Sequence, residues 1–180
     1  AIHRVVVDLG KGGVTQLESG LAELFEVERK PLGSTGEVLQ ELRRMGEGGK
    51  AVYGFTTGDG SEVQYLTLKE SVDPKALDQS DHSAAWRKLG SGLLQLVLGK
   101  VLDLNDETLT RGEKVKFVKV EADVLNLVRE APDRAGFFLN PVGMSELREV
   151  VLAGERMPPK STFFYPKVYS GLVIQDLNSF

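Results

Sequence analysis

The stretch that decides the fold class is AVYGFTTGDGSEVQYLTLK, residues 51–69. Two runs rich in β-branched and aromatic residues flank Gly58-Asp59-Gly60. An Asp-Gly pair between two such runs is typical of the tight turn of a β-hairpin. The sequence therefore predicts one antiparallel hairpin over about residues 51–69.

On either side of this hairpin, strand-like and helix-like segments alternate. Short β-branched or aromatic runs predict strands, at residues 2–8, 27–30, 115–120, 135–139 and 171–174. Apolar residues at helical spacing predict amphipathic helices, at residues 14–25, 38–45, 121–130 and 144–151. Interleaved elements with a clear hairpin indicate an α+β fold, or a mixed-sheet α/β sandwich.

The strongest helical pattern follows a polar segment near the middle of the chain. Apolar residues from Trp86 to Val101 recur on one face, and Asp81 or Ser83 can cap the helix that they predict. Asn105 can cap a further turn. The polar segment at residues 70–80 contains Pro74 and is a candidate boundary between two lobes, residues 1–70 and 81–180.

Composition narrows the classes of function. The chain has 180 residues, 41% of them hydrophobic and 27% charged, which suits one domain or two small lobes sharing a core. Its net charge of -4 argues against nucleic acid or an anionic membrane as a partner, so any anion site must be local. The absence of cysteine excludes disulfides, thiol nucleophiles and zinc-thiolate sites. No apolar run is long enough to span a membrane.

The first residues predict a cytoplasmic protein. Ala1 to Asp8 forms a strand-like run at once, without the apolar stretch and cleavage site of a signal peptide. Because the chain opens inside such an element and without Met, we expect it to be part of a longer protein.

Known glycine motifs fit poorly. The P-loop pattern fails because Arg44 replaces its first Gly and Ala51 replaces its Ser or Thr. Residues 10–15 begin like a dinucleotide fingerprint, but Thr15 replaces the third Gly. The amides of Gly12 and Gly13 could still hold an anion at a helix start, although a simple strand-to-helix turn is the preferred interpretation.

Residues 156–175 differ from the rest of this acidic chain. They read RMPPKSTFFYPKVYSGLVIQ, with three cations and no acid. Hydroxyl side chains lie between the cations, and three prolines restrict the backbone, which lowers the entropy lost on aiming side chains at a ligand. This pattern predicts a phosphate- or carboxylate-binding segment. The alternative is a tail anchored by its apolar residues, with solvated cations.

The same segment carries a family resemblance. Residues 154–167, GERMPPKSTFFYPK, followed by Ser170-Gly171-Leu172-Val173, closely resemble the C-terminal signature of the family of unknown function numbered 1015 (DUF 1015). The opening His3-Arg4-Val5-Val6 and residues 137–141 match this family more weakly, so the likeness spans the chain. Members of the family are longer and carry an upstream Gly-His-His-Arg type motif that this sequence lacks.

The resemblance implies a small-molecule kinase, because some members of the family look like enzymes that phosphorylate free serine with ATP. It implies ATP and Mg²⁺ as cofactors, a small anionic ligand, and the N-terminal part of the same protein as partner. It identifies no catalytic residue and no metal ligand here. The phosphate- or substrate-binding candidates that it implies are Arg156, Lys160, Ser161, Thr162, Tyr165 and Lys167, with His3, Arg4, Gly12 and Gly13 as secondary candidates.

Two alternatives to the kinase part remain open. One is a non-enzymatic module that binds an acidic metabolite, and the other is a structural domain that packs on the N-terminal part.

Overall fold

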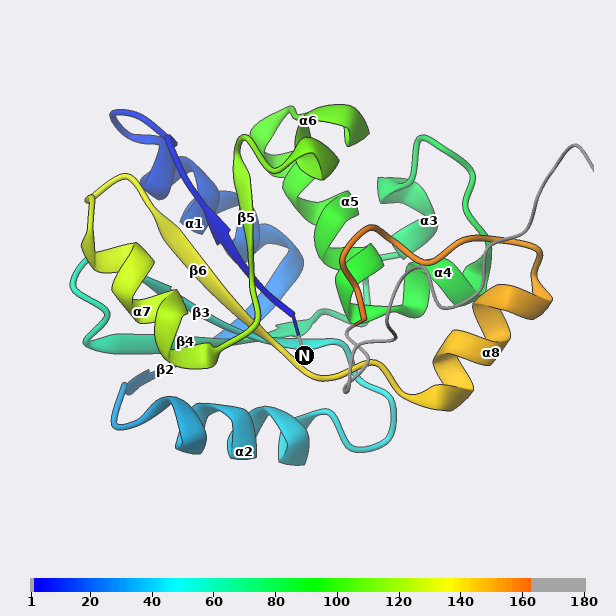
Figure 1. The fold of residues 1–180 in the computed structure, drawn as a ribbon, viewed down its shortest axis with the longest axis horizontal. Helices are drawn as coiled ribbons and strands as arrows, with labels where there is room; N and C mark the ends of the chain where they lie inside the picture. The colour runs from blue at the N-terminus through cyan, green and yellow to red at the C-terminus, as the bar shows by residue number, and fades with distance from the viewer. Residues whose placement is uncertain (1, 163–180) are drawn as a thin grey trace, which may run out of the picture.

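The computed structural model describes residues 2–162 and has the predicted α+β fold, with one antiparallel sheet of six strands in the order β2-β4-β3-β6-β1-β5 (Figure 1). The strands are β1 (His3–Val6), β2 (Phe25–Pro31), β3 (Val52–Thr57), β4 (Glu62–Leu68), β5 (Val115–Val118) and β6 (Ala135–Leu139). The helices are α1 (Gly13–Leu24), α2 (Thr35–Met45), α3 (Pro74–Leu77), α4 (Ala84–Lys88), α5 (Gly90–Leu102), α6 (Asp106–Arg111), α7 (Glu121–Arg129) and α8 (Met144–Leu152).

The predicted hairpin is confirmed as β3 and β4, paired antiparallel. Its turn contains two glycines with positive φ, Gly58 at 63° and Gly60 at 68°, a conformation that glycine adopts without steric cost. The Asp59 carboxylate accepts the Ser61 amide at 2.9 Å and stabilises the turn. The sequence could predict this hairpin because the turn residues and the two strands are adjacent in the chain.

Both faces of the sheet are buried, because apolar residues occupy both sides of its central strands. In β6, Phe137 and Leu139 belong to the core beneath α1 and α5, whereas Phe138 belongs to the core beneath α2 and α7. Successive side chains of a strand point to opposite faces, so continuous apolar runs serve two cores. Figure 1 shows these helices on the two sides of the sheet.

The sheet draws strands from both sides of residues 70–80. β6 lies between β3 and β1, so the two predicted lobes share one sheet and both of the cores on its faces. The polar segment itself contains the short helix α3. No helix in the described part of the chain is long and apolar enough to cross a membrane.

The single helix predicted through Trp86 to Val101 is wrong in its continuity. The chain forms α4, capped by the Ser83 hydroxyl, and then α5, with Leu89 extended between them. A Cβ at position 92 would lie 2.5 Å from the Trp86 carbonyl oxygen, so Gly92 permits this close approach. Glycines are also poor helix formers. The break places Ser91 in the first turn of α5.

Candidate functional site

The predicted anion segment leaves α8 and runs back past α4 and α5 toward β1 (Figure 1). Its first anchor is the carboxylate of Glu155, which accepts the Ser83 amide at 2.9 Å and faces His82 Nδ1 at 3.1 Å. Burial alone would raise the pKa of Glu155, but the hydrogen bonds from Ser83 and His82 outweigh it and lower this pKa. The start of the segment is therefore held by an ionised carboxylate.

His82 completes this anchor by stacking on Trp86, with the ring centroids 3.8 Å apart. An ionised carboxylate only accepts hydrogen bonds, so the arrangement places a proton on His82 Nδ1. The other ring nitrogen, Nε2, is buried and has no hydrogen-bond partner within residues 2–162. The aromatic stack and the Glu155 carboxylate join the segment to α4.

A second anchor lies at the far end of the segment. Pro158 is buried, and the buried hydroxyl of Ser161 donates to its carbonyl oxygen. Lys160 has a φ of 54°, in the left-handed region, and its carbonyl accepts a long hydrogen bond of 3.4 Å from Arg4 Nη2. A non-glycine residue in this region costs on the order of 1 kcal/mol and persists only where its surroundings hold it.

The cations of the segment point outward from this held backbone. The side chains of Arg156 and Lys160 are exposed, and neither forms an ion pair with an acid among the described residues. Thr162 is half-buried. Ser161 differs from its predicted role, because its hydroxyl hydrogen is already used by Pro158. Tyr165 and Lys167 lie outside the described residues.

Arg4 is the secondary candidate that the fold brings to this segment. Its side chain is buried, with 6% of the residue exposed, and Nη1 donates to the carbonyls of Ile2 at 2.8 Å and His3 at 3.3 Å. The guanidinium carbon lies 4.5 Å from the centre of the Phe117 ring. Burial lowers the pKa of Arg4 to about 10, which leaves it charged at neutral pH. No carboxylate among the side chains that the structure describes pairs with it.

His3 is separated from Arg4 by the sheet itself. Neighbouring residues of a strand point to opposite faces, and His3 packs edge-on against Phe138 of the core beneath α2 and α7. Its Nδ1 accepts the Leu139 amide at 3.1 Å, and burial lowers its pKa to about 4. His3 is therefore a neutral, hydrogen-bonded core residue, on the other face from Arg4.

The glycine turn is also separate from the segment. Gly12, with a φ of 81°, caps α1 beyond the far end of β1, and Gly13 begins that helix. The amide of Gly10 faces the Asp133 carboxylate at 3.4 Å, and the Leu9 amide donates to the Asp133 carbonyl. An acid of the chain itself already lies at the amides of this turn.

The structure adds residues that sequence reasoning missed. Ser91 and Phe117 line a small cavity with Arg4 and Pro159. Nothing local singles them out, since Ser91 stands in an apolar helix and Phe117 in a short strand. Arg4 and Lys160 are 156 positions apart, and only the fold shows that they meet.

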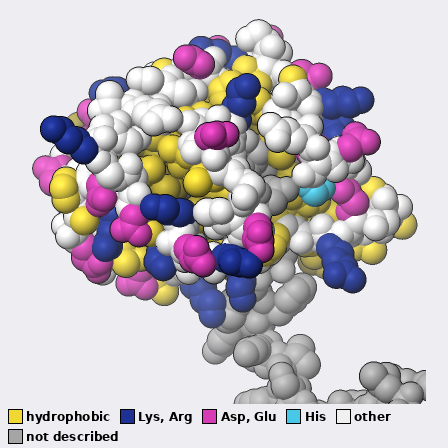
Figure 2. All heavy atoms as spheres, turned by 90° about the horizontal axis from the view of Figure 1, so that it is seen from above, with side chains coloured by type: hydrophobic (Ala, Val, Ile, Leu, Met, Phe, Trp, Pro, Cys, Tyr) yellow, Lys and Arg dark blue, Asp and Glu magenta, His cyan; other side chains and the backbone are white. Residues whose placement is uncertain are grey.

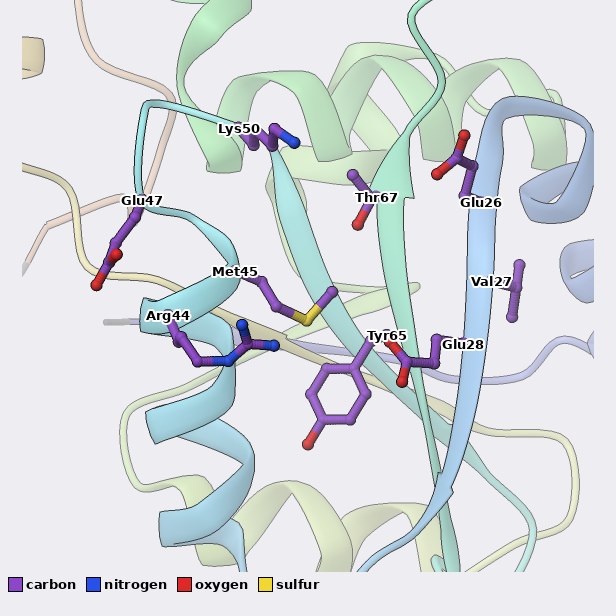
Figure 3. A pocket seen from close by; sticks show the side chains of 9 residues that line it. All are labelled: Glu26, Val27, Glu28, Arg44, Met45, Glu47, Lys50, Tyr65 and Thr67. Carbon is purple, nitrogen blue, oxygen red and sulfur yellow. The ribbon is translucent and has the colours of Figure 1, made fainter.

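A larger cleft of about 550 Å³ lies elsewhere, between α2 and the edge strand β2 (Figure 3). Glu26 and Glu28 form one wall and Arg44 and Lys50 the other. Arg44 donates to Glu41 at 2.7 and 2.8 Å, so one of the two cations is already neutralised. Because carboxylates lie along β2, this cleft is less suited to binding an anion than residues 156–162 are.

Surface charge gives no stronger candidate on the side of the molecule that is uppermost in Figure 1. There, basic and acidic side chains are interspersed around exposed hydrophobic ones (Figure 2). Mixed charges of this kind create no extended field for a polyanion. Comparison of the chain with family models, with curated proteins and with solved structures found no match.

Proposed function

We propose that this chain is the anion-binding C-terminal part of an ATP-dependent small-molecule kinase of the DUF 1015 type, in which residues 156–171 hold a phosphate group. The observation that supports it most is a pair of exposed cations, unpaired among the described residues, on a backbone held at both ends. Arg156 and Lys160 lie between the Glu155 anchor and the Ser161 anchor. A held backbone reduces the entropy lost when these side chains engage a ligand.

In this reaction the γ-phosphoryl group passes from ATP to the hydroxyl of free serine. The bond from phosphorus to the bridging oxygen of ADP breaks, and a bond to the serine oxygen forms. The hydroxyl proton goes to a base that the N-terminal part of the protein supplies. Lys160 and Arg156 neutralise phosphate charge, because catalysis of phosphoryl transfer rests mainly on positioning and charge stabilisation.

A second candidate function is a ligand-binding or structural module without phosphoryl transfer. It is favoured by the use of the segment in packing. Met157 packs against the small core formed by Trp86, Leu89, Leu96 and Val150, and Ser161 is turned inward. A purely structural module gives the exposed cations no role, whereas a ligand-binding module uses them without phosphoryl transfer.

Thermal unfolding of this chain with inorganic phosphate, and separately with Mg-ATP, tests the proposal. Ligand at about 100 times its dissociation constant should stabilise the fold by about 2.7 kcal/mol. Lys160→Ala should remove this effect without loss of stability, since both residues carry a Cβ and bear the same left-handed strain. Lys75→Ala, an exposed lysine on α3, is the matched control.

The outcomes separate the two functions. Stabilisation by phosphate that persists in both Lys160→Ala and Arg156→Ala would place the anion elsewhere. Binding that depends on Lys160, without serine phosphorylation by the full-length protein, would support the non-enzymatic module.

A further inference from the structure

A small, partly open cavity lies beneath Pro159, lined by residues of β1, α5, α6 and β5. Its volume is about 20 Å³. A cavity needs roughly 10–15 Å³ on this measure to hold one water molecule, so this one takes a single water-sized particle. Its lining is Arg4, Ser91, Leu94, Gln95, Leu98, Leu109, Val115, Phe117 and Pro159.

Two of these lining groups have hydrogen-bond donors to spare. A guanidinium has five N–H donors, and Arg4 makes three hydrogen bonds to carbonyls of the described residues, those of Ile2, His3 and Lys160. The Ser91 hydroxyl is buried, in a residue that is 7% exposed, and has no partner within residues 2–162. The guanidinium therefore brings only donors to the cavity, and the Ser91 hydroxyl is free to donate there as well.

The charge of Arg4 at this cavity also has no carboxylate partner among the side chains that the structure describes. Taking a cation out of water is costly even after the surroundings relax. The cation–π contact with the Phe117 ring offsets only part of this cost. The three carbonyls add hydrogen bonds but no negative charge. Water in the cavity would satisfy donors and leave the charge, whereas an anion would satisfy both.

We propose that this cavity binds a monatomic halide, chloride under ordinary conditions, between the guanidinium of Arg4 and the hydroxyl of Ser91. Its small volume favours a single atom over phosphate or sulfate. The leucine, valine and phenylalanine side chains around it suit a weakly hydrated anion better than a strongly hydrated one. This inner site is distinct from the exposed cations of the proposed function, and it stands whether or not those bind phosphate.

The halide would also support the neighbouring segment. Arg4 bonds to the Lys160 carbonyl, and a countercharge in the cavity keeps this guanidinium in place beneath residues 158–161. The site therefore couples a buried ion to the backbone that carries Lys160.

The first test compares thermal unfolding in sodium chloride, sodium bromide and sodium gluconate at equal ionic strength. Both halides should raise the melting temperature saturably, by about 5–10 °C at 100 times the dissociation constant, and gluconate should not. Crystals soaked in bromide should show one anomalous peak between Arg4 and Ser91. Equal melting curves in all three salts, or no peak at this position, would overturn the proposal.

Two variants assign the site to its residues. Ser91→Ala removes one donor and should weaken halide binding at least several-fold, while Ser19→Ala, an exposed serine on α1, should leave it unchanged. Arg4→Met should abolish the halide response. If Arg4→Met does not fold, Ser91→Ala with bromide decides alone, because an unchanged halide response in that variant contradicts the site. Neither variant tests phosphate binding by Lys160, so the two proposals fail separately.

Discussion

His3 and Arg4 are neighbours on β1 and nearly equally buried, yet the two faces of the sheet treat them differently. His3 enters the core beneath α2 and α7, loses its charge and accepts the Leu139 amide. Arg4 enters the other face, stays charged and finds carbonyls and an aromatic ring but no acid within residues 2–162. At His3, the face beneath α2 and α7 is an ordinary core in which the polar side chain is hydrogen-bonded. At Arg4, the other face has a buried charge without a described carboxylate partner, as a binding site would.

The largest expected effect concerns the pH dependence of the His3 face. The pKa of His3 is about 4 in the folded protein, lowered from its ordinary value of 6.5. The folded state binds fewer protons, so stability is full above pH 6.5 and falls as the pH drops toward 4, by about 3 kcal/mol in all. Urea unfolding at several pH values should show this slope in the wild type. A slope of the same size in His3→Gln would contradict the assignment.

Matched apolar replacements sharpen the comparison further. His3→Leu leaves the Leu139 amide buried without an acceptor and should cost about 1–3 kcal/mol. Arg4→Met removes a buried charge without a described carboxylate partner but also leaves the carbonyls of Ile2, His3 and Lys160 without this donor, so in halide-free buffer it should cost less than His3→Leu. Chemical denaturation of both variants measures the two changes in the free energy of unfolding. If Arg4→Met destabilised as much as His3→Leu, the two faces would be equivalent.

A smaller effect is expected at the anchor that joins the segment to α4. Glu155→Gln keeps the side-chain length but removes the charge that faces His82, and should cost about 1 kcal/mol. The lowered pKa of Glu155 means that this contribution is present above its unfolded pKa and is lost as the pH falls through the folded one. Thermal melts at pH 7 should separate the variant from wild type, and melts at low pH should not.

The smallest effect on stability is expected at Lys160. Its side chain is exposed and unpaired among the described residues, so Lys160→Ala should change the free energy of unfolding by less than about 0.5 kcal/mol. The same variant should lose its response to phosphate. A large loss of stability would instead identify Lys160 as part of the packing, as the structural alternative requires.

Several elements were readable from the sequence because their causes are local. The Asp-Gly turn and the flanking runs predicted the hairpin, and the Asn105 cap is present, accepting the Thr108 amide at 2.8 Å. The helix through residues 86–101 was mispredicted because its apolar spacing is regular across Leu89. The break depends on the close approach of Gly92 to the Trp86 carbonyl, and spacing alone carries no information about that contact.

The candidate site, like the fold, was predicted only in part from the sequence. The sequence singled out residues 156–175 by charge and composition, and the positions of Arg156 and Lys160 agree with exposed cations. It could not show that Ser161 turns inward, that His3 and Arg4 face apart with only Arg4 near the segment, or that Gly10 meets the carboxylate of Asp133. Each of these depends on contacts between residues distant in the chain.

By itself, then, the sequence determined the α+β class, the hairpin and the basic segment, because turn chemistry, side-chain alternation and local charge act over a few residues. Only the tertiary structure decided which charges are paired, which polar groups are buried and which partners meet. It joined Arg4 to Lys160 across 156 positions and put Ser91 beside them in one cavity. Burial is the physical reason, since the cost of an unpaired charge or donor depends on the whole fold that excludes water from it.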